Sequence, residues 1–162
     1  MKTMIRSFAL AALPAVLLLC PAVAVAAAPS YGPAIDLAAA KKVAAAAEAA
    51  AQKVSSQPDV IAIVDPHGAL VYFERMDGAQ FGSIEVALSK ARSAALFRRP
   101  TKVFAERMAK GATALLGLVG ATPVPGGEPI LANGKVIGAI GASGGTGEED
   151  DKVAMAGVAV AK

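Results

Sequence analysis

The stretch PGGEPILANGKVIGAIGASGGTGEEDDKVAMAGVAVAK, from Pro125 to Lys162, decides the fold that the sequence predicts. Its centre, residues 135–142, has the apolar pattern of a buried strand. The preceding pair Asn133-Gly134 suits a tight hairpin, because both central residues of a type I′ turn need a positive φ. We therefore expect residues 128–132 and 135–142 to form two antiparallel strands joined by this turn.

Beyond this hairpin, Ser143-Gly144-Gly145 should end the strand, and Thr146 should cap a helix. Acidic residues fill positions 148–151, in the first turn of that helix, where free N–H groups carry partial positive charge. A glycine loop can also cradle phosphate, but no P-loop lysine follows this one and four carboxylates would repel a phosphate. We expect the glycines to let the helix turn back closely onto the sheet.

Residues 1–28 have the features of a secretory signal peptide. Lys2 and Arg6 precede an apolar stretch from Phe8 to Leu19, and small residues suited to cleavage follow it. A membrane anchor is the alternative, but the apolar run is too short to span a bilayer. We therefore expect an exported protein, periplasmic or extracellular, with a single domain over residues 29–162.

The composition argues against several classes of function. The 162 residues include 16 basic and 13 acidic ones, so loss of Lys2 and Arg6 leaves 14 basic residues and a net charge of +1. No basic run with interleaved aromatic residues occurs, so we expect no nucleic-acid partner. The single cysteine, Cys20, lies in the predicted signal peptide. The exported domain should therefore have neither a disulfide nor thiolate chemistry.

Helices alternate with a second hairpin between the signal and the C-terminal stretch. Apolar residues at helical spacing predict a helix over residues 36–55. A hairpin follows, with strands over 60–64 and 70–75 and a turn at 65–68 in which Pro66 presets φ and Gly68 accepts a positive φ. Two hairpins among helices indicate an α+β domain with a central antiparallel sheet of about five strands.

Two further helices precede the C-terminal hairpin. Ser83 should cap the first, over residues 84–98, and its exposed side should carry Lys90, Arg92, Arg98 and Arg99. Thr101 should cap the second, shorter helix, which should end near residue 110.

Three segments resemble the GlcG/HbpS family, also called the haem-degrading domain family: VIAIVDPHGALVYFERMDGA, SIEVALSKARSAALF and GGEPILANGKVIGAIGASGGTGEEDDKVAMAG. They follow the family's order and cover nearly all of the chain after the predicted signal. The resemblance implies a profilin-like fold that assembles into homo-oligomers. It also implies haem or another small molecule as the ligand and, as for one exported member, a membrane sensor kinase as a partner.

The residues leave the mode of haem binding open. Axial ligands are normally His, Met, Cys or Tyr, and the single histidine, His67, lies in a predicted turn, where a solvated polar role is commoner. The alternatives are Tyr31, Tyr72, Met76, Met108 and Met155. The candidates for binding the cofactor are His67, Arg75, Asp77, Arg92, Gly144 and Gly145, and Arg98 is a further candidate partner for haem propionates.

Two classes of function follow from these residues. The first is a non-enzymatic exported protein that binds haem or another small ligand. The second is an enzyme that acts on a small organic substrate, haem included, with Arg75, Asp77 and the glycine loop near its site. No catalytic arrangement is recognisable. The acids at 148–151 could hold a hard cation, but helix capping accounts for them, so we expect no metal site.

Overall fold

The computed structural model describes residues 27–161 of the chain, so the predicted signal peptide lies almost wholly outside the described residues. The elements follow the order α1 (Leu37–Val54), β1 (Val60–Val64), β2 (Leu70–Arg75), α2 (Gly82–Phe97), α3 (Lys102–Ala109), the 3-10 helix η1 (Thr113–Gly117), β3 (Gly127–Ala132), β4 (Lys135–Ser143) and α4 (Gly147–Val158). Among the described residues, no helix combines the length and the apolar character needed to cross a membrane.

The strands form one antiparallel sheet in the order β2-β1-β4-β3. The predicted α+β class with a central antiparallel sheet is thus confirmed, although the described residues contribute four strands to the sheet rather than about five. Beside the start of β4, where a further strand would pair, the chain makes only one parallel bridge, between Tyr31 and Val136. The backbones of Ser30 and Gly32 bond to Val136, and this pairing is too short to form a strand.

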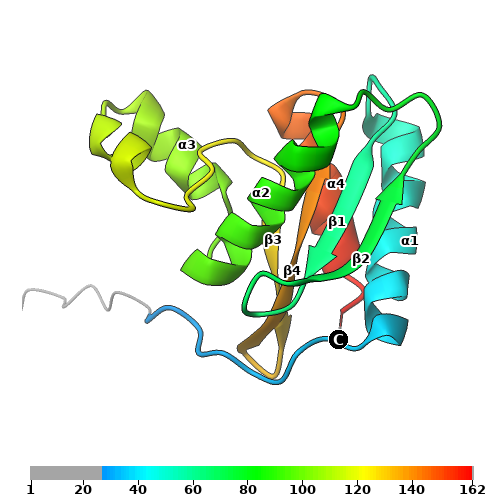
Figure 1. Ribbon diagram of the computed structural model, residues 1–162, viewed down its shortest axis with the longest axis horizontal. Coiled ribbons are helices and arrows are strands. Elements are labelled where there is room, and N and C mark those ends of the chain that lie inside the picture. The colour runs from blue at the N-terminus through cyan, green and yellow to red at the C-terminus, as the bar shows by residue number, and fades with distance from the viewer. Residues whose placement is uncertain (1–26, 162) are drawn as a thin grey trace, which may run out of the picture.

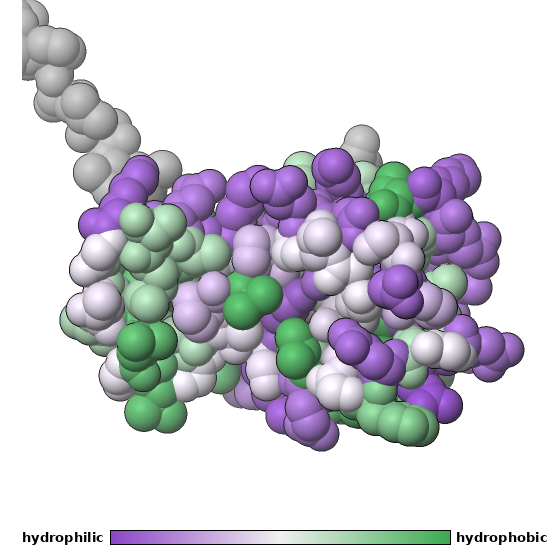
Figure 2. All heavy atoms as spheres, turned by 90° about the horizontal axis from the view of Figure 1, so that it is seen from above, coloured by the Kyte–Doolittle hydropathy of each residue, from purple (hydrophilic) through white to green (hydrophobic). Residues whose placement is uncertain are grey.

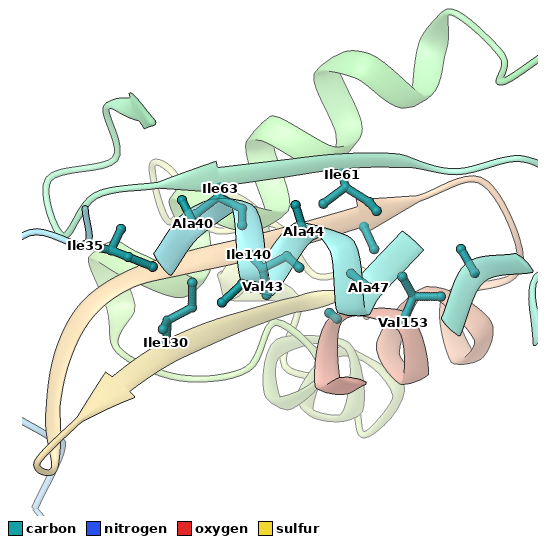
Figure 3. Packing of buried hydrophobic residues seen from close by; sticks show 13 residues of the cluster. Ile35, Ala40, Val43, Ala44, Ala47, Ile61, Ile63, Ile130, Ile140 and Val153 are labelled. Carbon is teal, nitrogen blue, oxygen red and sulfur yellow. The ribbon is translucent and has the colours of Figure 1, made fainter. Parts of the chain in front are cut away.

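Helices cover both faces of the sheet, with α1 and α4 on one face and α2 on the other (Figure 1). The larger core lies between the sheet, α1 and α4 (Figure 3) and is made of Ile35, Ala40, Val43, Ala44, Ala47, Ala51, Ile61, Ile63, Ile130, Ile140, Ala142, Val153 and Ala154. The smaller core lies under α2. The continuous apolar run of β1 follows from this arrangement, because Ile61 and Ile63 face α1 while Val60, Ala62 and Val64 face α2.

Small residues bring α2 very close to β4. A Cβ atom added at Gly141 would collide with the backbone carbonyl of Ala87 and the amide nitrogen of Ala91. The helix face that meets the strand is itself an alanine stripe, formed by Ala87, Ala91, Ala94 and Ala95. Glycine in the strand and alanine in the helix therefore set the spacing between these two layers.

Two of the predicted local features are confirmed. Asn133 and Gly134 both have positive φ, 50° and 72°, as a type I′ turn requires. At the start of α4, the Thr146 side chain accepts a hydrogen bond from the amide of Glu149, and the Glu149 carboxylate accepts one from the amide of Thr146. This reciprocal pair is a capping box, which fixes where α4 begins.

Two predicted caps are wrong. Helix α2 begins at Gly82, one residue before Ser83, so Ser83 does not precede the helix as a cap would. The Ser83 side chain is buried against that of Ser143. Thr101 does precede α3, but its hydroxyl donates to the carbonyl of Val124 and accepts from the amide of Gly127. Both hydroxyls are buried where elements join, so they satisfy partners across the fold rather than the nearby helix end.

Lys90 was predicted on the exposed side of its helix, and this is also wrong. Its side chain is only 1% exposed and lies on the same face of α2 as Ala87, Ala91 and Ala94. The spacing from Ala87 and Ala94 is three and four residues, which places Lys90 inside the apolar stripe. A buried ammonium group needs a charged partner, and α4 supplies it.

Candidate functional site

The C-terminal end of α2 carries a mixed apolar and basic surface, the α2-end patch, defined by Tyr31, His67, Arg92, Leu96 and Arg98. The hydroxyl of Tyr31 donates to the carbonyl of Leu96 over 2.8 Å, and the Arg98 guanidinium lies 5.2 Å from the centre of the Tyr31 ring. Arg92 Nε donates to the carbonyl of Gly68, next to His67, over 3.2 Å. Tyr31, His67, Arg92 and Leu96 are all exposed. The patch therefore joins three segments that are distant in sequence.

The turn that holds His67 has a fixed backbone. One oxygen of the Asp65 carboxylate accepts hydrogen bonds from the amides of His67 and Ala69, at 2.8 and 2.9 Å. Gly68 has a φ of 85°, as the sequence predicted for the end of this turn. The imidazole of His67 is thus presented to solvent from a rigid turn beside Arg92.

The other predicted site residues lie at the opposite end of the sheet. Val60, at the start of β1, pairs with Arg75 on one side and with Ser143 on the other, so Arg75 and Asp77 lie at the end that also holds the glycine loop. The Arg75 guanidinium stacks 5.1 Å from the centre of the Phe81 ring. Of the candidates, the structure therefore gathers His67, Arg92, Arg98 and Tyr31 in the α2-end patch. It places Arg75, Asp77, Gly144 and Gly145 at the other end of the sheet.

The glycine loop is packed rather than open. A Cβ atom at Gly144 would lie 2.5 Å from the carbonyl oxygen of Pro58 and against the Asp59 carboxylate. The amides of Gly144 and Gly145 both donate to one oxygen of Asp150, at 3.1 and 3.0 Å. This matches the close approach expected for these glycines, and it leaves their amides already bonded to a carboxylate of the chain itself.

Asp150 also forms a buried ion pair with Lys90. The ammonium lies 2.6 Å from the second carboxylate oxygen of Asp150 and 2.9 Å from the carbonyl of Ala142, and the side chains are 1% and 4% exposed. Burial raises the pKa of Asp150, and the hydrogen bond from Lys90 opposes that rise. Burial also raises the pKa of Asp59, which lies beside this pair. The sequence suggested helix capping for the acids, but the Asp150 carboxylate is buried and bonds to Lys90 and to the glycine loop.

A cleft of about 650 Å³, the α3–α4 cleft, lies between those two helices. It is lined by Lys102, Ala105, Glu106, Ala109, Pro125, Glu148, Asp151, Lys152 and Met155. Lys102 Nζ is 3.2 Å from Asp151 Oδ2, and the two side chains are 50% and 6% exposed. Asp151 Oδ1 is buried and accepts no hydrogen bond from any residue between 27 and 161.

Glu128, on β3, is electrostatically coupled to this cleft. Burial, and after it the negative charge of Asp151, raise the pKa of Glu128 to about 7, while the positive charge of Lys102 opposes the rise. Glu128 did not stand out in the sequence, and Asp151 did so only as one of the acids at 148–151, because the proximity of the two depends on α4 packing beside β3.

The raised pKa of Glu128 predicts a stability that depends on pH. In the folded protein Glu128 keeps its proton up to about pH 7, whereas the unfolded chain releases it near the ordinary value of 4.5. The stabilisation is present below that lower value and is lost as the pH rises through 7. We expect Glu128→Gln to flatten the decline in unfolding free energy between about pH 5 and 8 by about 1–2 kcal/mol, after allowance for partial exposure.

Chemical denaturation at both pH values measures this effect. Glu106→Gln, on an exposed residue of α3, is the matched control and should retain the wild-type decline. An identical pH dependence in Glu128→Gln and the wild type would contradict the prediction.

Comparisons with known proteins agree with the fold. A family model described as "Haem degrading protein HbpS-like" matches residues 35–159. GlcG of Escherichia coli strain K12 is 39% identical over 83 residues, which cover 51% of this chain and 62% of GlcG. The chain thus spans less than two thirds of that relative.

Two solved structures are similar over most of their length. HbpS superposes with a TM-score of 0.74 and 35% identity, covering 82% of this chain and 94% of HbpS. A complex of PduOC with haem gives a TM-score of 0.69 and 28% identity, covering 78% of this chain and 94% of PduOC.

Proposed function

Because the chain belongs to the HbpS-like family of haem-degrading proteins, as its sequence resemblance predicted, we propose that it binds haem on the α2-end patch. The observation that carries this proposal is the composition of the patch. It unites the single imidazole of the chain, two guanidinium groups and the exposed apolar side chains of Tyr31 and Leu96. The PduOC–haem complex adds support from a relative of the same fold.

The donor set of the patch fits haem. Guanidinium groups pair strongly with carboxylates, so Arg92 and Arg98 would hold the propionates. The Tyr31 ring and Leu96 would contact the macrocycle, and His67 offers the imidazole that iron commonly takes as an axial ligand. Bound haem would supply a redox-active iron, while the chain's own residues orient it and shield one face. The α3–α4 cleft suits haem less well, because Glu106, Glu148 and Asp151 would repel propionates.

We predict that Arg92→Ala weakens haem affinity about tenfold, because a charge-assisted pair with a propionate contributes about 1.5–3 kcal/mol. Titration with hemin, followed by the Soret absorption, measures the affinity. Arg75→Ala is the matched control, since Arg75 lies at the other end of the sheet, and it should bind haem like the wild type. His67→Ala should shift the Soret maximum, because the iron loses its imidazole.

Equal affinity in Arg92→Ala and the wild type, or a loss confined to Arg75→Ala, would place the haem elsewhere. An unchanged Soret maximum in His67→Ala would show that His67 is not an axial ligand of the iron.

Haem degradation is the second candidate function, since the matching family is described by that activity. It predicts that the Soret absorption of the bound haem decays in the presence of a reductant and oxygen, faster than for free hemin. A Soret band that persists under those conditions would leave binding as the function.

We also propose that residues 1–28 direct export and that the exported protein works beside a membrane sensor kinase. The support is the signal-like pattern of the sequence and the resemblance to an exported family member. Cell fractionation tests the first part: the protein should appear, shortened at its N-terminus, outside the cytoplasm. Full-length protein retained in the cytoplasm would overturn it.

A homo-oligomer is our further prediction, based on apolar residues exposed around η1. Val119 is 93% exposed, and Leu116 and Leu118 are also exposed. Figure 2 shows hydrophobic side chains gathered at the end of the molecule that holds α3 and η1. Burying such a surface between subunits stabilises a protein by mass action. Light scattering should give a multiple of the monomer mass for the wild type. Leu116→Asp should give a lower mass, because the charge opposes burial of this surface between subunits.

Leu37→Asp, on an exposed leucine of α1, is the control for this change and should leave the mass unaltered. A wild-type protein that is monomeric at micromolar concentration would contradict the prediction.

A further inference from the structure

Asp151, in the α3–α4 cleft, has an oxygen that the rest of the described chain leaves unsatisfied. The residue is 4% exposed, and its Oδ2 pairs with Lys102 while its Oδ1 accepts nothing from residues 27–161. Leaving a charged acceptor buried without a partner costs free energy, so such groups need an explanation. A donor brought by a ligand would satisfy it.

Within residues 27–161, the only side chain that pairs with Asp151 is that of Lys102, which can move away. Lys102 is half exposed, on a long flexible stem, and lies 3.2 Å from Oδ2. Because half of the Lys102 side chain is already exposed, its ammonium group can swing into solvent when it leaves Asp151. A second ammonium group could therefore take the place of Lys102 beside the carboxylate, and it has three N–H donors with which to reach both oxygens.

The remaining walls of the cleft define the rest of the ligand. Ala105, Ala109, Pro125 and Met155 provide an apolar lining. The three acidic residues that line the cleft exceed the two lysines, so the local charge favours a cation. A volume of about 650 Å³ is within the range of sites that enclose small organic molecules.

A bare metal ion does not meet these conditions. No group of three or more His, Cys, Asp or Glu side chains within the described residues is placed to hold a metal ion together. We therefore propose that the α3–α4 cleft binds a small organic amine, protonated at neutral pH, whose ammonium group pairs with Asp151 and whose apolar body lies against Met155 and the α3 alanines.

This site is separate from the haem surface. The α2-end patch is built from α2, the β1–β2 turn and Tyr31, whereas the cleft is built from α3, α4 and Pro125. Binding of an amine therefore neither requires nor excludes haem, and each proposal stands or fails alone.

Isothermal titration calorimetry with hexylammonium chloride tests the proposal, with sodium hexanoate as the probe of the same length and opposite charge. We expect hexylammonium to bind at least tenfold more tightly than hexanoate. Asp151→Asn should weaken hexylammonium binding about tenfold or more, because it removes a charge-assisted hydrogen bond. Asp77→Asn is an identical change on an exposed residue that follows β2, the edge strand opposite β3, and it should not alter binding.

Lys102→Met tests the same site in the opposite direction, and its result remains informative if Asp151→Asn fails to fold. If the ligand competes with Lys102 for Asp151, this variant should bind hexylammonium several-fold more tightly than the wild type. Weaker binding by Lys102→Met, equal binding of hexanoate and hexylammonium, or unchanged binding by a folded Asp151→Asn would each overturn the proposal.

Discussion

Replacing Lys90 with methionine is expected to lower the free energy of unfolding by about 3–5 kcal/mol, the usual cost of removing one partner from a buried ion pair. Methionine has a similar volume, so little packing is lost. The damage comes from Asp150, which would remain buried without its ammonium partner at 2.6 Å. The loss should grow from about pH 5 to pH 8, because burial already raises the pKa of Asp150 and a protonated carboxyl is less costly to bury.

Urea denaturation measures this loss against two further variants. Lys41→Met, on the exposed side of α1, should stay within about 0.5 kcal/mol of the wild type. The double variant Lys90→Met with Asp150→Asn should recover much of the stability, since the amide oxygen can still accept from Gly144 and Gly145 without a buried charge. A single Lys90→Met variant as stable as the Lys41 control would show that the pair does not stabilise the fold.

Gly141→Ala should be nearly as damaging as the loss of Lys90. Overpacking a core costs about 1–3 kcal/mol, and we expect about 3 kcal/mol here because the obstacle is the backbone of α2 at Ala87 and Ala91. A helix backbone cannot rotate aside as a side chain can, so the helix as a whole must lift away from β4.

Gly82→Ala is the matched control for the strand glycine. Gly82 begins α2, has no neighbour within 4 Å of an added Cβ atom, and should tolerate alanine with a neutral or slightly stabilising effect. Thermal denaturation compares the two variants directly. Similar melting temperatures would show that α2 can adjust its distance from the sheet.

Local chemistry made much of the fold predictable. The Asn133-Gly134 turn and the capping box at Thr146 depend on neighbours within four residues, and the sequence contains both partners of each interaction. The same holds for the strand at residues 60–64, whose unbroken apolar run indicates burial on both faces. These features appear in the structure where the sequence placed them.

Features that depend on distant partners were not predictable. Lys90 was assigned to solvent because lysine usually lies there, and its partner Asp150 is sixty residues away. Tyr31 was named only as an alternative haem ligand, and nothing in the sequence indicated that it bridges to β4 and covers the end of α2. The position of Lys90 inside the alanine stripe was the one available signal, since a charge on an apolar face is unusual without a partner.

The candidate site likewise contains parts that the sequence could indicate and parts that it could not. The sequence named His67 and Arg92 as candidates, and in the structure Arg92 bonds to the hairpin turn that holds His67. It could not join them to Tyr31 and Leu96, because that contact arises only when the N-terminal segment folds across α2. The α3–α4 cleft was missed for a similar reason, since its walls come from α3, α4 and Pro125, which are separate in the sequence.

The bridge between Tyr31 and Val136 has a consequence for aggregation. Val136 lies on the part of β4 that extends beyond the end of β1, and its N–H and C=O groups bond to Ser30 and Gly32. A protein shortened to begin at Ile35 would keep every helix and strand but would leave those groups unpaired. An open strand edge is a template on which another chain can pair. The short N-terminal segment therefore guards the sheet against growth from one molecule into the next.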